Sequence, residues 1–182
     1  MFARTPRLLL RPGFPEDAPA LAHAIGDLAI ARNLAVVPWP YTIRDAEAFL
    51  ASPRDPVLPS FLIFERTDSA PRLIGSCGLG RRPSGAVELG YWIARASWGR
   101  GFATEAGKAL IDIAHSLALP QLEASHFIDN PASARVLDKL GFESTGIIAP
   151  RMNCARGEEV PARLMRLRLT AAVGKKEEAL AA

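Results

Sequence analysis

A short glycine-containing segment has the residue types of a phosphate-binding site. In SWGRGFATEAGKAL, Gly99 and Gly101 flank Arg100 directly before a run with helical spacing. The first amides of a helix lack partners within the helix and lie at the positive end of its dipole, and glycine lets a bulky anion approach the backbone. We therefore predict that an anion binds to this turn, with Arg100 adding a mobile charge, at the residues Trp98, Gly99, Arg100, Gly101, Phe102, Ala103 and Thr104.

The same glycines also suit a plain strand-to-helix turn, because a GxG pattern alone is a weak signal. Two familiar nucleotide motifs are incomplete or missing. Ala103 and Thr104 follow the second glycine where a dinucleotide-binding turn carries a third one, and no GK[ST] run marks a Walker A loop. The anion hypothesis therefore stands for this turn, but a dinucleotide and a nucleotide bound by a Walker A loop are not the expected ligands.

A second candidate residue lies in DNPASARVLDKLGF, which is predicted to form a helix with Asn130 as its cap. Ser133 precedes Val136 and Leu137 by three and four residues, so it shares their inward face. A hydroxyl among apolar side chains needs a partner. It either bonds back to the helix start or faces a ligand held between two helices, and the sequence leaves both open.

The elements that position these residues follow from hydrophobic spacing. The segment 86–94 alternates as a strand, with Val87, Leu89, Tyr91 and Ile93 on one face and Glu88, Gly90 and Trp92 on the other. A helix over 102–117 and a strand over 122–128 follow, so the two strands are predicted to be parallel neighbours joined by a right-handed crossover.

The remaining segments predict a mixed α/β chain. We expect two helices near the N-terminus, over 15–32 and 44–51, and a fourth helix over 130–140. Further strands are predicted over 7–12, 60–66, 72–80, 142–148 and 162–169, the last two antiparallel. The chain has no internal linker, so we expect one domain over 1–172 and a fraying polar tail over 173–182.

Composition narrows the class of protein. The 182 residues are 49% hydrophobic and 23% charged, with a net charge of +3. No apolar run reaches the roughly 18 residues of a membrane span, so we expect a cytoplasmic protein without a membrane partner. Cys77 and Cys154 show neither metal-ligand spacing nor a disulfide framework, and Cys77 is expected to be a small core residue.

The motifs ELGYWI, WGRGFATEA and NPASARVLDKLGF, in this order and spacing, resemble the core of the GNAT superfamily of N-acetyltransferases. The segments TPRLLLRP and VPWPYTIRDAEAFL resemble its Rim-type branch, which acetylates ribosomal-protein N-termini. The resemblance implies a twisted, mostly antiparallel sheet with one splayed parallel strand pair and about four helices. It also implies acetyl-CoA as cosubstrate and no metal, with the diphosphate on residues 98–103 and the pantetheine arm along Trp92 and Ile93.

The chemistry implied by the resemblance is direct attack of a neutral amine on the thioester. Glu88 is the candidate base, with a simply solvated carboxylate as the plainer interpretation, and His126 is a rival that better suits a hydrogen-bonded core histidine. Many family members protonate the thiolate with a tyrosine, but Leu137 occupies that position here. Ser133 is therefore the candidate donor and Asn130 is expected to orient the cofactor; water could also serve.

The acceptor amine is expected to lie against the N-terminal half, with Trp39, Tyr41, Glu88 and Trp92 lining its site. A protein N-terminal amine is the first hypothesis by analogy, followed by a small-molecule amine or amino acid. Two other classes stay open: a non-catalytic CoA-binding module, and a nucleotide-binding fold that shares the glycine turn by accident. No nucleic-acid partner is expected, and a homodimer is left open.

Overall fold

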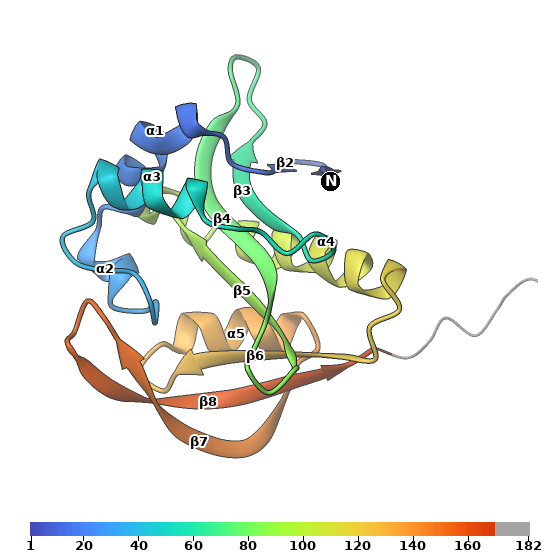
Figure 1. Ribbon diagram of the computed structural model, residues 1–182. Helices are drawn as coiled ribbons and strands as arrows, with labels where there is room; N and C mark the ends of the chain where they lie inside the picture. Colours follow the sequence, from blue (N-terminus) through green and yellow to red (C-terminus); the bar gives the residue numbers. More distant parts are fainter. Residues whose placement is uncertain (170–182) are drawn as a thin grey trace, which may run out of the picture.

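The computed structural model describes residues 1–169, whose strands form one eight-stranded sheet (Figure 1). The strand order is β1-β2-β3-β4-β5-β6-β8-β7, and every neighbouring pair is antiparallel except the parallel pair β5–β6. The strands are β1 Ala3–Arg4, β2 Leu8–Arg11, β3 Ser60–Glu65, β4 Arg72–Arg81, β5 Val87–Ile93, β6 Gln121–Phe127, β7 Glu143–Asn153 and β8 Glu158–Arg168. The mixed, mostly antiparallel sheet is therefore confirmed. The predicted tail over 173–182 lies outside the described residues.

The helices are α1 Ala18–Ile25, α2 Leu28–Ala31, α3 Ile43–Ala51, α4 Phe102–Ser116 and α5 Pro131–Lys139, with short 3-10 helices at Pro15–Asp17 and Arg95–Ser97. The sequence predicts a single helix over 15–32, and this continuity is wrong. The Oδ1 of Asp27 accepts a hydrogen bond from the amide of Ala29 at 2.8 Å and so starts a new helix, α2.

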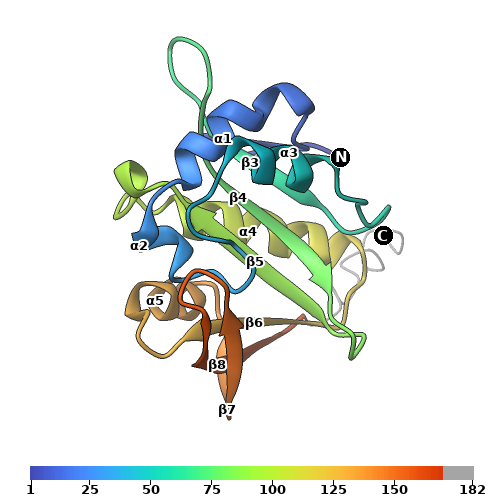
Figure 2. The ribbon, with the colours of Figure 1, turned by 60° about the vertical axis from the view of Figure 1, so that its left-hand side comes forward.

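Helices cover both faces of the sheet and create two apolar layers (Figures 1 and 2). On one face, α4 packs against β2, β4 and β5, and α5 packs against α4 and β6. This layer holds the larger core, which includes Phe61, Phe102, Leu110, Leu122 and Leu137. On the other face, α1 and α3 pack together over a smaller core, which includes Leu21, Leu50, Leu62 and Phe64. The predicted alternation of β5 is confirmed, since Val87, Leu89 and Ile93 are buried in the larger core.

The parallel pair opens almost at once. β5 and β6 are paired at Glu88 and Glu123, and toward the C-terminal end of β5 the strands diverge (Figure 1). The crossover between them is α4, as predicted. This divergence leaves one backbone edge of β5 without a strand partner, so an extended ligand has hydrogen-bonding groups to meet there.

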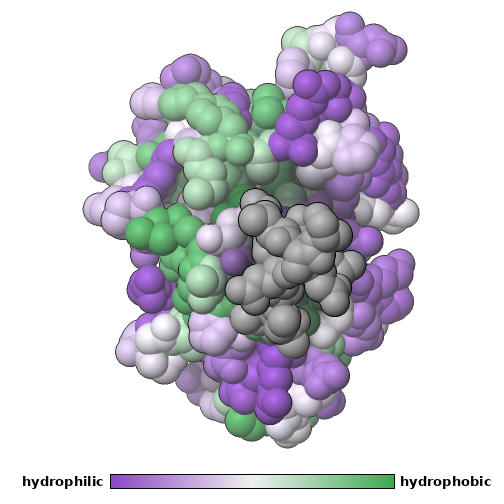
Figure 3. Space-filling view, turned by 90° about the vertical axis from the view of Figure 1, so that its right-hand side faces the viewer, coloured by the Kyte–Doolittle hydropathy of each residue, from purple (hydrophilic) through white to green (hydrophobic). Residues whose placement is uncertain are grey.

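The surface mixes polar and apolar residues. On the face shown in Figure 3, hydrophobic residues gather toward the left and hydrophilic residues toward the right and below. None of the described helices combines the length and the apolar character needed to cross a membrane.

Candidate active site

The turn before α4 is built from two glycines in the left-handed conformation. Their φ angles are +73° at Gly99 and +80° at Gly101, values that side chains with a Cβ rarely adopt. Gly101 is the N-cap of α4 and offers no side chain to cap the helix. Within residues 1–169, no protein group accepts a hydrogen bond from the amides of residues 99–104. We refer to residues 98–104 as the amide cradle.

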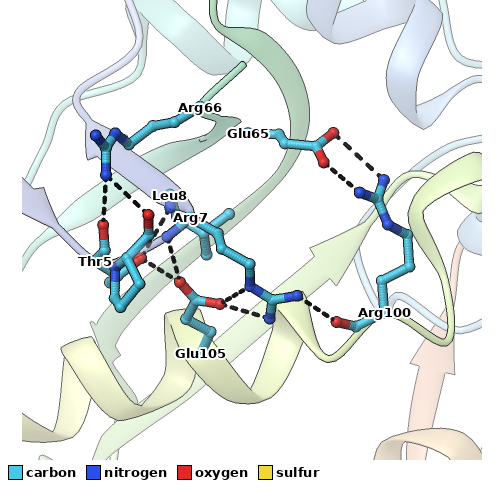
Figure 4. Close-up of polar contacts among 8 residues, drawn as sticks. Thr5, Arg7, Leu8, Glu65, Arg66, Arg100 and Glu105 are labelled. Carbon is cyan, nitrogen blue, oxygen red and sulfur yellow. Dashed lines mark hydrogen bonds and ion pairs between the residues drawn. The ribbon is translucent and has the colours of Figure 1, made fainter. Parts of the chain in front are cut away.

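The side chain of Arg100 points away from the cradle (Figure 4). Its guanidinium pairs with Glu65 on β3 at 2.5 Å, and hydrogen bonds from Arg72 and Arg100 hold the pKa of Glu65 below its usual value. The mobile charge expected from Arg100 is therefore already engaged by a carboxylate. Among the described residues, the backbone amide of Arg100 has no protein acceptor and stays available to an anion in the cradle.

Glu105 fastens the cradle to the N-terminal turn between β1 and β2 (Figure 4). Its carboxylate accepts hydrogen bonds from the hydroxyl of Thr5 at 2.6 Å and from the amide of Arg7 at 2.9 Å. The guanidinium of Arg7 pairs with the same carboxylate at 2.6 Å and also donates to the carbonyl of Arg100 at 2.9 Å. Two segments nearly a hundred residues apart thus hold the helix start in place.

Trp98 secures the other end of the cradle. Its indole Nε1 donates to the carbonyl of Ile93 at 2.6 Å, which ties the turn to the last residue of β5. No local pattern in the sequence indicates this contact. It places the amide cradle directly beyond the unpaired edge of β5.

A cavity of about 1010 Å³ runs from the cradle along β5. Its floor includes Gly80 and Gly90, where a Cβ atom would meet nothing within 4 Å and no unusual φ requires glycine. At these positions glycine therefore keeps space open in the cavity. The predicted site residues that line the cavity are Tyr41, Glu88, Trp92, Ile93, Trp98, Gly99, Gly101, Phe102, Ala103, Thr104, Asn130 and Ser133.

Two predicted residues do not line this cavity. Arg100 faces Glu65, and Trp39 is exposed in the segment that leads to α3. Tyr41 and Trp92 do line it and also pack against the smaller core, and burial raises the pKa of Tyr41 to about 12. Of the three aromatic residues predicted to line the acceptor site, Tyr41 and Trp92 therefore line the cavity, and Trp39 does not.

Glu88 is surrounded by donors that the sequence does not reveal. Its two carboxylate oxygens accept from Arg82 at 2.7 and 3.0 Å, from Arg151 at 2.7 and 3.2 Å, and from the hydroxyl of Ser125 at 2.9 Å. Arg151 also donates to Ser125. Burial alone would raise the pKa of Glu88, but the two arginines outweigh it and lower that pKa to about 2. Such a carboxylate is a weak proton acceptor while both arginines stay in place.

Ser133 meets a phenol rather than the helix start. Its Oγ lies 2.9 Å from the hydroxyl of Tyr91 on β5, while its amide donates to the Oδ1 of the cap residue Asn130 at 3.1 Å. Burial raises the pKa of Tyr91 to about 12, so the phenol keeps its proton at neutral pH. The sequence places Tyr91 on the core face of its strand, and that face proves to border the cavity.

His126 and Cys77 are buried residues that also line the cavity. His126 is buried, and its Nδ1 forms a hydrogen bond with the carbonyl of Phe127 at 2.9 Å, in line with the plainer expectation. Burial raises the pKa of the Cys77 thiol to about 12, which keeps the thiol protonated.

Comparison with known proteins gives one consistent result. A family model for the acetyltransferase (GNAT) domain matches residues 7–143. The chain is 31% identical over 152 residues to the uncharacterized N-acetyltransferase p20 of Bacillus licheniformis, covering 79% of this chain and 83% of that protein.

Solved structures of acetyltransferases share the fold. A GNAT-family acetyltransferase from Bacillus anthracis superimposes with a TM-score of 0.76 at 19% identity, over 92% of this chain and 98% of that one. RimL, a ribosomal L7/L12 alpha-N-protein acetyltransferase in complex with coenzyme A, gives a TM-score of 0.77 at 16% identity, over 94% and 99%.

Proposed function

The chain belongs to the GNAT acetyltransferases, and on that premise we propose that it transfers the acetyl group of acetyl-CoA to a primary amine. One observation carries this proposal: the unpaired amides of the cradle open into the same cavity as the unpaired edge of β5. A diphosphate and an extended amide-bearing arm are the two chemical groups that such an arrangement suits.

The residues fit coenzyme A as follows. Amides of residues 99–104 would hold the diphosphate, and the edge of β5 near Trp92 and Ile93 would pair with the pantetheine arm. The backbone of Trp92 pairs with Ser76 on β4, and the carbonyl of Ile93 already accepts from Trp98. We therefore assign the pairing to the amide of Ile93 and to the backbone of Tyr91, which face the open edge. A Cβ on Gly99 would meet no protein atom within 4 Å, so space for the ligand exists where the amides are exposed.

The departing thiolate would receive its proton from the pair formed by Ser133 and Tyr91. When the phenol donates to the Oγ of Ser133, the hydroxyl proton of Ser133 is free to point into the cavity. The pair would thus replace the phenol that Leu137 cannot provide. The low pKa of Glu88 makes it a weak base as long as Arg82 and Arg151 remain bound to it. In that state we propose that water accepts the proton of the attacking amine.

For the acceptor, a protein N-terminal amine is the first candidate. Its support is the similarity to RimL, which acts on a protein α-amine. Tyr41 and Trp92 give the acceptor side an aromatic lining that can hold an N-terminal side chain.

A matched pair of glycine variants tests the cradle. Gly99 and Gly85 both have positive φ and open space where a Cβ would lie, but only Gly99 lines the cavity. We expect Gly99→Ala and Gly85→Ala to lose similar stability, about 1 kcal/mol or more, because both strain the backbone. Gly99→Ala alone should weaken coenzyme A binding, by roughly tenfold, in calorimetric titrations.

Turnover decides between the classes of function. Thiol release from acetyl-CoA would be followed with a panel of free amines and short peptides. Coenzyme A binding together with turnover of any amine supports the proposal. Binding without turnover of any amine indicates a non-catalytic CoA-binding module, and the absence of heat on titration of the folded protein removes the proposal.

A further inference from the structure

Two arginines share one carboxylate at the acceptor end of the cavity. Arg82, in the turn between β4 and β5, and Arg151, on β7, both pair with Glu88 at 2.7 Å. Among residues 1–169, neither arginine pairs with any other carboxylate. The group therefore carries one net positive charge, which faces the cavity because all three residues line it.

Part of this guanidinium surface is free to bind an anion. Within the described part of the chain, Nη1 of Arg82 and Nε of Arg151 donate to no protein atom. These atoms are accessible, since the one buried side-chain nitrogen or oxygen without a partner there is Nε of Arg166. The side chains of Arg82 and Arg151 are 31% and 34% exposed. Each arginine therefore has at least one N–H group that does not donate to Glu88.

The diphosphate of coenzyme A cannot be the anion in question. Glu88 lies near the first residue of β5, and the cradle begins beyond its last residue, Ile93. At about 3.3 Å per residue, the five steps from Glu88 to Ile93 span roughly 17 Å. The arginines thus lie at the far end of the cavity, where the acceptor would enter, beside the open floor at Gly80 and Gly90.

Other carboxylates near this end are already engaged. Glu123, opposite Glu88 on β6, acts electrostatically on Arg82 but is paired with Arg166 at 3.3 Å. Asp45 is the other acidic residue that lines the cavity, and its carboxylate is held at the start of α3 by the hydroxyl of Thr42 at 2.6 Å. Arg81 adds a further cation, which leans toward Asp55 at 3.5 Å. An acceptor with only positive charge would be repelled here, whereas one with its own anion would be attracted.

We propose that the acceptor is a primary amine that carries a carboxylate a few bonds from its nitrogen, and that Arg82 and Arg151 bind this carboxylate. The proposal rests on the acetyltransferase function above and names its substrate class. Arginine suits the role because its planar group binds carboxylates through two parallel hydrogen bonds. The carboxylate comes either from a free amino acid or from an acidic first residue of a peptide.

Binding of such a substrate would also change Glu88. Each guanidinium that turns toward the substrate carboxylate withdraws hydrogen bonds from Glu88. Those hydrogen bonds are what lower its pKa, so that pKa rises when they weaken. The carboxylate then becomes a better proton acceptor at the moment when the amine is in place, which would restore the role expected of Glu88 from the sequence.

The test compares acceptors that differ in one carboxylate. Free aspartate and glutamate are compared with their α-carboxamides, and short peptides that begin with Asp or Glu are compared with peptides that begin with Asn or Gln. We expect kcat/KM to be roughly 10- to 100-fold higher for the carboxylate of a pair. A preference within the first set identifies a free amino acid as the source, and a preference within the second identifies an acidic peptide.

Variants assign the preference to the arginines. Arg151→Gln and Arg82→Gln should remove most of it, and Arg151→Lys should retain part. Arg168→Gln, which changes an exposed arginine outside the cavity, should leave it unchanged. Calorimetry with coenzyme A shows that each variant is folded. The proposal is overturned if the wild type turns over both members of every pair equally. It is also overturned if Arg151→Gln lowers kcat/KM equally for both members of a pair. Absence of turnover with every amine would instead refute the acetyltransferase function itself.

Discussion

At the scale of single residues, Glu88 shows how partners decide what a carboxylate does. Its pKa falls from 4.5 in a free chain to about 2, even though burial alone would raise it. A group whose pKa is lower in the folded state stabilises the fold above its unfolded pKa, and this stabilisation disappears as the pH falls through the folded pKa. The relevant window is therefore between pH 4.5 and about 2.

This leads to a prediction for Glu88→Gln, measured by urea unfolding from pH 7 to pH 2.5. The wild type should exceed the variant in free energy of unfolding by a constant amount near neutrality. The difference should shrink by up to about 3 kcal/mol as the pH falls through the window. Glu47→Gln, which changes an exposed carboxylate without a hydrogen-bond partner among the described residues, should show no such narrowing. A difference for Glu88→Gln that stays constant with pH would contradict the ion pairing.

The identity of Glu88, Ser133 and the cradle residues is readable from the sequence because each lies in a local pattern of a strand, a helix or a turn. The hydrogen-bond partners of Glu88 and Ser133 cannot be read from the sequence in this way. Arg151 and Ser125 reach Glu88 from β7 and β6, and Tyr91 reaches Ser133 from another element. Alternation places Ser125 on one face of its strand, yet nothing local indicates which residue it would meet.

At the scale of elements, the start of α4 depends on a turn from the other end of the chain. Three donors from Thr5 and Arg7 converge on Glu105, and Arg7 also binds the carbonyl of Arg100. This arrangement holds the amide cradle in a fixed geometry before a ligand arrives. Preorganised donors bind an anion more tightly because less freedom is lost on binding.

Glu105→Gln should therefore weaken coenzyme A binding by roughly three- to tenfold, because it removes the ion pair with Arg7 and leaves the cradle less ordered. The kcat at saturating acetyl-CoA should change little, because Glu105 is distant from the acceptor end. Asp112→Asn, on the exposed side of the same helix, is the matched control and should bind normally. If both variants bind coenzyme A like the wild type, the contacts of Glu105 with Thr5 and Arg7 do not contribute to binding at the amide cradle.

Most elements could be predicted, because hydrophobic spacing and capping signals are local. The helix cap at Asn130 and the parallel strands around α4 are examples. The failure at Asp27 has the same origin: an apolar run continues through a residue whose side chain prefers to begin a new helix.

At the scale of the whole molecule, one buried side chain joins the two halves on the acceptor side. Asn153, at the end of β7, is fully buried, and its Nδ2 donates to the carbonyls of Arg32 and Leu34 at 2.9 and 3.1 Å. Its Oδ1 accepts from the amide of Arg156 at 2.8 Å. The sequence could not reveal this link, because Arg32 and Leu34 lie about 120 residues before Asn153 in the chain.

Asn153 also affects the geometry of the cavity, since Leu34 and Arg151 on the two joined segments line it. Leucine has a similar volume but makes no hydrogen bonds. In Asn153→Leu the carbonyl of Leu34 therefore loses its partner, and the carbonyl of Arg32 keeps only the hydrogen bond from Nε of Arg156. We expect a loss of about 1–3 kcal/mol in the free energy of unfolding. The KM for the amine should rise several-fold because the acceptor side loses its fixed width, while the affinity for coenzyme A should stay near the wild-type value.

Thr145→Val is the control for this variant. The hydroxyl of Thr145 donates to the carbonyl of Leu164 at 2.9 Å and accepts from the amide of Ile147 at 3.2 Å, both within the β7–β8 hairpin. Thr145→Val therefore removes hydrogen bonds without affecting the other half of the molecule. It should leave the KM for the amine unchanged. If Asn153→Leu raised the dissociation constant of coenzyme A as much as the KM for the amine, the two ends of the cavity would not be independent. In that case a change at Asn153 would reach the cradle that the N-terminal turn holds in place, so binding at the two ends of the cavity would be coupled.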